Sequence, residues 1–325
     1  MGKDGRTLYE QSGYGRPDNE GICLAPQEAL YLLHRHKIEM PGCSFDALLA
    51  RFADQHNFLR SFLVYRDLRE RGYVVQTGPH DFRVFRRGDK PGTGESRYSV
   101  RVLSERDPVR FESLIGEIVA SRNMRKQYIL AVVDDENELT YYEIKLQKPV
   151  NRRTPVPDPA SCEAELVGRY GIVSVPQGSD LEASGYGQRL DDQRLVLSPV
   201  ELHYLMETNI VALKRNGIPV GIAEYRKSTR NTDSELPGKL AVYAELRKAG
   251  FTPRTGYKFG HHFRVYGEKT VHSEMLVHAI GKDDVMPMSI ISRSVRMAHS
   301  VKKKMLFGCV HSNGIQFVEF ARIKL

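Results

Sequence analysis

The stretch Thr255-Gly-Tyr-Lys-Phe-Gly-His-His-Phe-Arg-Val-Tyr266 is the one from which the rest of the sequence can be organised. Phe263-Arg-Val-Tyr266 alternates apolar and polar residues, as a half-buried strand does. The two glycines before it permit the turns that a short hairpin needs. Tyr266 and His272 are separated by a short polar segment, so we expect a phenol and an imidazole on neighbouring strands.

Several segments of this chain occur twice, and the stretch above belongs to the second copy. Two copies indicate a duplication, because a solenoid needs at least three units. The recurring pairs are Ser12-Gly-Tyr-Gly15 with Ser184-Gly-Tyr-Gly187, residues 22–33 with 195–206, residues 64–72 with the helical segment that ends at Gly250, and residues 81–85 with 262–266.

Both copies show the same order of helix and strand signals. A proline and an acid mark a helix start at Pro26 and at Pro199, and later helices stop at Gly72 and Gly250. Strands, a long amphipathic helix and a final buried hairpin follow. The predicted fold class is therefore α/β, in two tandem repeats, each a small helical N-terminal subdomain followed by a mixed-sheet α/β subdomain.

Proline content places the predicted boundary between the repeats. Residues 149–159 contain four prolines and predict an extended linker. We expect repeats at 1–150 and 171–325 with a linker at 151–170. The second repeat is expected to divide into subdomains of about 171–250 and 251–325.

Composition limits the compartment and the class of partner. The formal net charge of +8 favours a polyanionic partner without requiring one. The four cysteines form no C-x-x-C pair, which argues against a zinc ribbon or a disulfide framework. No apolar run is long enough to span a membrane, so we expect a cytoplasmic protein.

Comparison of the two copies separates the scaffold from candidate chemistry. In our sequence alignment of the repeats Phe85 stands opposite Tyr266, Tyr98 opposite His272 and Lys126 opposite Lys303. The first copy keeps apolar bulk but lacks the phenol and the imidazole. Only the second copy is therefore predicted to be catalytic.

The sequence closely resembles the archaeal tRNA-splicing endonucleases, in the class that fuses a pseudo-catalytic and a catalytic repeat and works as a homodimer. The resemblance rests on residues 256–260 and 263–266, on His272-Ser-Glu274, and on Val295-Arg-Met-Ala-His-Ser-Val-Lys-Lys303. One departure is Met275, where an aromatic residue often follows the glutamate. The resemblance implies a catalytic triad of Tyr266, His272 and Lys303, and a pair, Arg296 and Arg322, that stacks on both faces of a bulged base.

The chemistry of these groups suits RNA cleavage without a metal or another cofactor. RNA supplies its own nucleophile, the 2′-hydroxyl, so the enzyme must provide geometry, proton transfer and charge stabilisation. His272 can protonate the leaving 5′-oxygen, and Lys303 can stabilise charge on the phosphorane. Tyr266 is a candidate base or a group that only orients the 2′-hydroxyl. The expected products are a 2′,3′-cyclic phosphate and a 5′-hydroxyl.

An acidic segment in the first copy has a neutral counterpart in the second. Asp134, Asp135, Glu136 and Glu138 cluster between two predicted strands, whereas the corresponding segment is His311-Ser-Asn-Gly314. Such a charge run is usually a solvated turn. The resemblance implies instead that this loop docks into a basic groove on the catalytic repeat of a second copy of the chain.

The resemblance thus implies an endoribonuclease that excises introns from precursor tRNA at bulge-helix-bulge sites. The alternative is a non-catalytic RNA-binding or structural subunit built on the same scaffold. A metal-dependent nuclease would need clustered carboxylates, and Asp283-Asp284, in an expected loop, is the nearest candidate.

Overall fold

The structure is a computed structural model that describes residues 3–19, 21–55, 57–149, 159–231, 233–267, 272–281, 283–311 and 314–325. The chain divides into two compact units that are not continuous in sequence. The first unit comprises Met1–Leu146, Val285–Arg296 and Glu319–Leu325. The second comprises Gln147–Asp284 and Met297–Val318.

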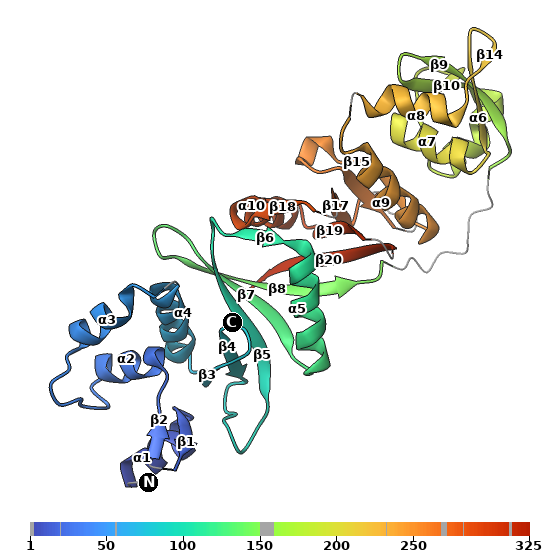
Figure 1. Cartoon of the computed structure of the whole chain (residues 1–325). Helices are drawn as coiled ribbons and strands as arrows, with labels where there is room; N and C mark the ends of the chain where they lie inside the picture. The colour runs from blue at the N-terminus through green and yellow to red at the C-terminus, as the bar shows by residue number, and fades with distance from the viewer. Residues whose placement is uncertain are drawn as a thin grey trace. The chain divides into compact units, whose positions relative to one another are not determined.

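Both units contain helices and strands, many of which are labelled in Figure 1. The helices are α1 (Lys3–Ser12), α2 (Pro26–His34), α3 (Phe45–Ala53), α4 (Phe58–Glu70), α5 (Phe111–Asn123), α6 (Val175–Ala183), α7 (Pro199–Glu207), α8 (Ile222–Arg230), α9 (Leu236–Lys248), the 3-10 turn η1 (Tyr257–Phe259) and α10 (Met288–Ser300). The strands of the first repeat are β1 (Arg16–Asp18), β2 (Gly21–Cys23), β3 (Val75–Thr77), β4 (Phe82–Phe85), β5 (Ser96–Ser104), β6 (Pro108–Arg110), β7 (Gln127–Val133) and β8 (Leu139–Gln147). Those of the second are β9 (Cys162–Val167), β10 (Tyr170–Ser174), β11 (Gln188–Arg189), β12 (Arg194–Leu197), β13 (Val211–Arg215), β14 (Ile218–Pro219), β15 (Thr252–Thr255), β16 (Phe263–Tyr266), β17 (Met275–Ile280), β18 (Val285–Pro287), β19 (Lys304–His311) and β20 (Gly314–Ile323).

The N-terminal part of the first unit is a small helical layer built from α2, α3 and α4 (Figure 1). Aromatic rings join these helices, with Tyr31 against Tyr65 at 5.8 Å and Phe45 against Phe62 at 6.3 Å between centroids. Pro26 opens α2, as the sequence indicates, because its missing N–H would have no partner there.

The remainder of the first unit is a mixed sheet with the strand order β8-β7-β5-β4-β3. β5 and β7 run parallel, and the other neighbours are antiparallel. β7 is buried from Tyr128 to Val133, as its apolar sequence predicts. Val285–Arg296 belongs to this unit because β18 pairs with β6 and the N–H of Met288 donates to the carbonyl of Asp107 at 3.0 Å.

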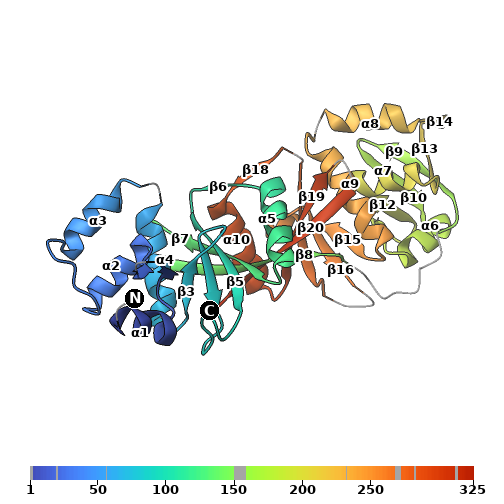
Figure 2. The ribbon, with the colours of Figure 1, turned by 60° about the horizontal axis from the view of Figure 1, so that its bottom comes forward.

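The second unit repeats the mixed sheet in the order β15-β16-β17-β19-β20, with β17 and β19 parallel. α9 lies close against this sheet, since a Cβ on Gly308 of β19 would come within 2.9 Å of Val242. Its N-terminal part contains a sheet of order β11-β12-β10-β9-β13-β14, beside which α7 and α8 lie (Figure 2).

The recurring Ser-Gly-Tyr-Gly motif joins the N-terminal part of each repeat to the following helix. The guanidinium of Arg69 lies 3.6 Å from the ring centroid of Tyr14, and that of Arg247 lies 3.7 Å from that of Tyr186. The last glycine of each motif donates its N–H to a buried acid, Glu28 or Glu201. Both repeats therefore use the same two contacts to hold this motif in place.

The structure confirms the mixed α/β class and differs from the expected layout in three respects. β9 lies inside the range 151–170 expected as linker, while residues 150–158 are outside the described parts. The second N-terminal subdomain contains a sheet where a helical layer was expected. Two C-terminal segments belong to the first unit. All three depend on pairing between distant segments, which local composition does not encode.

The described helices include none that combines the length and the apolar character needed to cross a membrane.

Candidate active site

Tyr266 is the last residue of β16, where its side chain is partly buried. It stands opposite Thr252 of β15. Side chains two apart on a strand share a face, and the guanidinium carbon of Arg264 lies 5.6 Å from the centroid of the Tyr266 ring. This arginine was not singled out from the sequence, because nothing local distinguishes it from the matching Arg83.

His272 is exposed and lies just before β17. The segment from 268 to 271, between it and β16, is outside the described residues. On its C-terminal side the backbone is fixed, because the N–H of Glu274 donates to the carbonyl of Val265 at 2.9 Å. The carbonyl of Glu274 accepts from the N–H of Lys304 at 3.0 Å.

Lys303 follows α10 and directly precedes β19. Its ammonium donates to the carbonyl oxygen of Ser273 at 2.6 Å, and its own N–H donates to the carbonyl of Ala298 at 2.8 Å. The side chain of Lys303 is partly buried. It therefore reaches the backbone of the residue next to His272.

Strand register explains why the three side chains lie at one end of the sheet. Val265, Met275 and Lys304 form a row across the adjacent strands β16, β17 and β19. β16 runs antiparallel to β17, and β17 runs parallel to β19. The end of β16 and the beginnings of the other two strands therefore share one edge, which carries Tyr266, His272 and Lys303.

The same row in the first unit corrects one of the sequence pairings. There Val84, Tyr98 and Gln127 lie opposite one another, so Tyr98 corresponds to Met275 and not to His272. The register of β4 with β5 shifts between Val84 and Phe85, so register places no described residue of the first repeat at the position of the histidine. The connection from Phe85 to Tyr98 is four residues longer than the one from Tyr266 to Met275, which misled the sequence alignment. Phe85 and Lys126 keep their expected places.

A groove of about 1060 Å³ lies in the second unit and reaches Tyr266. Its basic lining residues outnumber its acidic ones, Glu201 and Asp233. The basic residues are Arg169, Arg189, Lys239, Arg254 and Arg264. Several lining groups are buried without a hydrogen-bond partner in the described structure. These are the hydroxyl of Tyr243, both ring nitrogens of His261 and Nε of Arg264. A buried polar atom without a partner costs free energy, and a ligand or partner protein that supplied a hydrogen bond to it would remove that cost.

Three histidines pack together at this groove: His261 and His262 line it, and His278 packs against both. The rings of His262 and His278 stack at 4.1 Å between centroids, and His261 meets His278 at 5.7 Å. Burial and the neighbouring imidazole lower the pKa of His261 and of His278 to about 4 in each case. Burial and then the Lys239 ammonium lower the pKa of His262, although its Nε2 lies 3.3 Å from a carboxylate oxygen of Glu235. All three are therefore neutral at physiological pH.

The described residues contain no group of three His, Cys, Asp or Glu side chains placed to hold a metal ion. Asp284, the nearest sequence candidate, accepts a hydrogen bond of 2.6 Å from the N–H of Gly281 and so stabilises its own turn.

Arg296 and Arg322 are exposed, on α10 and on β20. Both belong to the first unit, whereas Tyr266, His272 and Lys303 belong to the second. Their role in holding a base stays a prediction.

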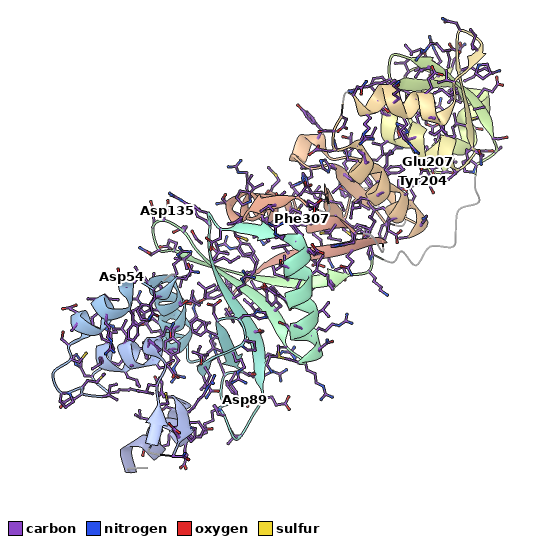
Figure 3. All side chains as sticks on the ribbon, in the orientation of Figure 1. Asp54, Asp89, Asp135, Tyr204, Glu207 and Phe307 are labelled. Atoms are coloured by element: carbon purple, nitrogen blue, oxygen red, sulfur yellow. The ribbon has the colours of Figure 1, made fainter. Side chains whose placement is uncertain are left out.

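The acidic segment forms the tight loop between β7 and β8, with Asp135 at its tip (Figure 3). Oδ1 of Asp134 accepts from the N–H groups of Glu136 and Glu138 at 3.0 and 2.9 Å, so this carboxylate shapes the loop. Asp135 pairs with Arg106. Glu136 and Glu138 are exposed and have no side-chain partner among the described residues. In the corresponding hairpin of the second copy, Ser312 and Asn313 are outside the described residues.

The duplicated domain organisation of this chain matches a known enzyme family. The family description "tRNA intron endonuclease, catalytic C-terminal domain" matches residues 58–141 and 236–317. The description "tRNA intron endonuclease, N-terminal domain" matches residues 2–49 and 162–226. The chain belongs to the tRNA intron endonuclease family and is an enzyme with two tandem copies of both domains.

Curated relatives agree over almost the whole length. A tRNA-splicing endonuclease of Methanosarcina acetivorans is 38% identical over 331 residues, which cover 98% of this chain and 95% of the relative. The tRNA-splicing endonuclease of Methanococcoides burtonii is 35% identical with the same coverage of both chains. That of Natronomonas pharaonis is 36% identical and covers 99% of this chain and 96% of its own.

Proposed function

We propose that this enzyme excises introns from precursor tRNA by cutting at bulge-helix-bulge sites without a metal ion. The observation that carries the proposal is the meeting of Tyr266, His272 and Lys303 at one edge of β16, β17 and β19. The family membership supports tRNA intron excision as the activity.

Each of the three groups has a role in this mechanism that its position supports. The phenol of Tyr266 orients the 2′-hydroxyl in line with the scissile phosphorus. As the 2′-oxygen bonds to phosphorus, its proton passes to solvent water and the bond to the 5′-oxygen breaks. The exposed imidazole of His272 gives that oxygen a proton. The products are a 2′,3′-cyclic phosphate and a 5′-hydroxyl.

The ammonium of Lys303 stabilises the charge that develops on the non-bridging oxygens. The bond to the carbonyl of Ser273 uses one of its three protons and leaves two for the phosphate. No redox step or Lewis acid is required by this route.

Recognition of the bulge is assigned to Arg296 and Arg322, which would hold one base between two guanidinium planes. Their exposure supports contact with RNA. Stacking of this kind recognises that a base is unpaired and does not distinguish which base it is.

We further propose that the enzyme acts as a homodimer in which the acidic loop of one copy enters the groove of the other. The loop carries exposed carboxylates, and the groove presents a basic excess with unpartnered buried groups. Complementary charges of this kind favour the correct partner and fix how the two surfaces align. Because each chain carries this loop and this groove, two reciprocal contacts close the dimer with two active sites.

The test is to incubate the purified protein with an intron-containing precursor tRNA in excess EDTA and to identify the ends of the products. We expect cleavage at both intron boundaries with 5′-hydroxyl ends, and none from a His272→Ala control. Cleavage that stops in EDTA and returns with magnesium would contradict the mechanism. Binding without cleavage by the wild type would favour the alternative of a non-catalytic subunit.

A further inference from the structure

The 3-10 turn η1 presents the most exposed large hydrophobic residue in the described parts of the molecule. The side chain of Tyr257 is 88% exposed, whereas Tyr243 and Tyr225 are 2% and 1% exposed. An aromatic ring left in water forgoes the favourable free energy of burying its apolar surface. Nothing in the family comparison or in the mechanism above uses this ring.

The turn that carries Tyr257 is held rigidly from both sides. The N–H of Phe259 donates to the carbonyl of Gly256 at 2.8 Å, and the N–H of Gly256 donates to the carbonyl of His262 at 3.0 Å. A Cβ on Gly256 would lie 2.8 Å from the backbone oxygen of His261, so only glycine fits there. Gly260 closes the turn at φ 72°. The ring is therefore displayed by a pre-organised element, which lowers the entropy lost on binding.

Tyr257 lines the same groove as Tyr266. Thr255 stands opposite Phe263, so Tyr257 follows the end of β15 that pairs with the start of β16, and β16 spans roughly 10 Å from there to Tyr266. That length is the rise of about three stacked nucleotides. Lys258, the residue after Tyr257, is exposed with its ammonium over the ring of Phe259, and Arg264 also lines the groove. Exposed aromatic and basic side chains along one groove are the arrangement that binds single-stranded nucleic acid.

We propose that Tyr257 is a stacking platform for an unpaired base of the RNA a few nucleotides from the cut phosphate. The inference rests on the proposed function and adds a contact to it. The acidic loop of a partner copy fits this ring poorly, because Asp134–Glu138 contains no aromatic residue and the negative face of a ring repels carboxylates. The loop would therefore use the cations of the groove and leave the ring to the RNA.

The experiment measures affinity for a bulge-helix-bulge RNA that carries 2-aminopurine at successive bulge positions. We expect binding to quench the fluorophore at one position in the wild type and in Tyr257→Phe, which keeps the ring. Tyr257→Ala should lose that quenching and bind roughly 5- to 100-fold more weakly. Ile218→Ala is the matched control, since Ile218 is 70% exposed but does not line the groove.

Sedimentation of the same variants without RNA separates the outcomes. A monomer shift in Tyr257→Ala would identify the ring as a contact between copies and overturn the inference. Wild-type affinity and quenching in Tyr257→Ala would also overturn it, while leaving the proposed function intact. Failure of the wild type to bind or cut the RNA would instead reject the proposed function.

Discussion

The ammonium of Lys303 donates a hydrogen bond of 2.6 Å to the backbone carbonyl of Ser273, the residue that follows His272. A cation expected to meet the phosphate therefore also fixes the backbone that carries the imidazole. The two roles can be separated experimentally, because only one of them exists before RNA binds.

Replacing Lys303 by alanine should remove both roles. We expect the single-turnover rate to fall by roughly 10²- to 10³-fold, and the amide hydrogens of Ser273 and Glu274 to exchange faster in the free enzyme. His272→Ala is the control: it should lower the rate by roughly 10²- to 10⁴-fold without changing that exchange. Unchanged exchange in Lys303→Ala would show that the bond to Ser273 does not hold this segment.

Restoring the phenol alone should not activate the first repeat. Phe85 is buried, 6% exposed, and the register of β4 with β5 shifts at Phe85, so the longer connection places no described residue at the position of His272. Glu95 ends this connection, directly before β5. In a His272→Ala background we expect neither Phe85→Tyr nor its combination with Glu95→His to cleave, because the longer connection displaces the imidazole. Cleavage by the double replacement, measured under single-turnover conditions, would contradict this reasoning.

The two exposed arginines should act through their planar faces. Arg296→Lys and Arg322→Lys keep the charge but lose the stacking surface, so each should impair cleavage of a bulged RNA. Sequence changes at the bulge should have small effects, which a set of four bulge bases can measure. Wild-type rates in Arg296→Lys would exclude the sandwich.

Association of two chains should depend on the exposed acids of the β7–β8 loop. We expect Asp135→Asn, Glu136→Gln and Glu138→Gln together to give a folded protein that sediments largely as monomer. Asp134 is left in place because it bonds the loop backbone. Arg106→Gln is the matched control, since it breaks the ion pair with Asp135 and leaves the acids intact. A triple variant that stays dimeric in moderate salt would show that the loop is only a solvated turn.

The histidines at the groove should make the fold sensitive to acid. In the folded state the pKa of His261 and that of His278 are about 4, below the ordinary value near 6.5. The folded state therefore binds fewer protons than the unfolded one, and stability is lost as the pH falls from about 6.5 to about 4. One such histidine contributes on the order of 3 kcal/mol over that range.

Unfolding midpoints measured between pH 7.5 and 4.5 test this expectation. His261→Asn should flatten the acid side of the curve, because an amide does not titrate. The exposed His36→Asn should leave it unchanged; His36 has φ 53°, which asparagine tolerates. Parallel curves for wild type and His261→Asn would show that this histidine is protonated in the folded state at little cost.

Local patterns predicted the elements of this fold well, because their causes are local. Pro26 and Pro199 open helices, and β7 and β19 are the buried strands that their apolar runs indicate. The candidate residues Tyr266, His272 and Lys303 could be named from motifs and the family resemblance. Their meeting at one edge required the register of three strands, which the sequence does not state.

Long-range pairing accounts for what was missed. β9 pairs with β13, and nothing in the composition after the prolines announces a strand at Cys162. The sequence alignment matched Tyr98 with His272 wrongly, because the connection before β5 is longer than the one before β17 and shifts the aligned residues. In the first repeat the carboxylate of Asp81 accepts a hydrogen bond from the N–H of Val102. At the matching position of the second repeat, Nδ1 of His262 accepts one from the N–H of Ala279. An acid and an imidazole therefore hold the same strand backbone in the two repeats. Such equivalence is visible only in three dimensions.

The last residues described belong to the core of the unit that begins the chain. Ile323 and Leu325 pack with its apolar residues, and the guanidinium of Arg71 donates to the carbonyl of Leu325 at 3.1 Å. Residues 297–318, which complete the second unit, are synthesised before Ile323 and Leu325, although domains usually fold in the order of their synthesis. The unit whose synthesis begins first is thus completed after the second one, because its core lacks two apolar residues until then.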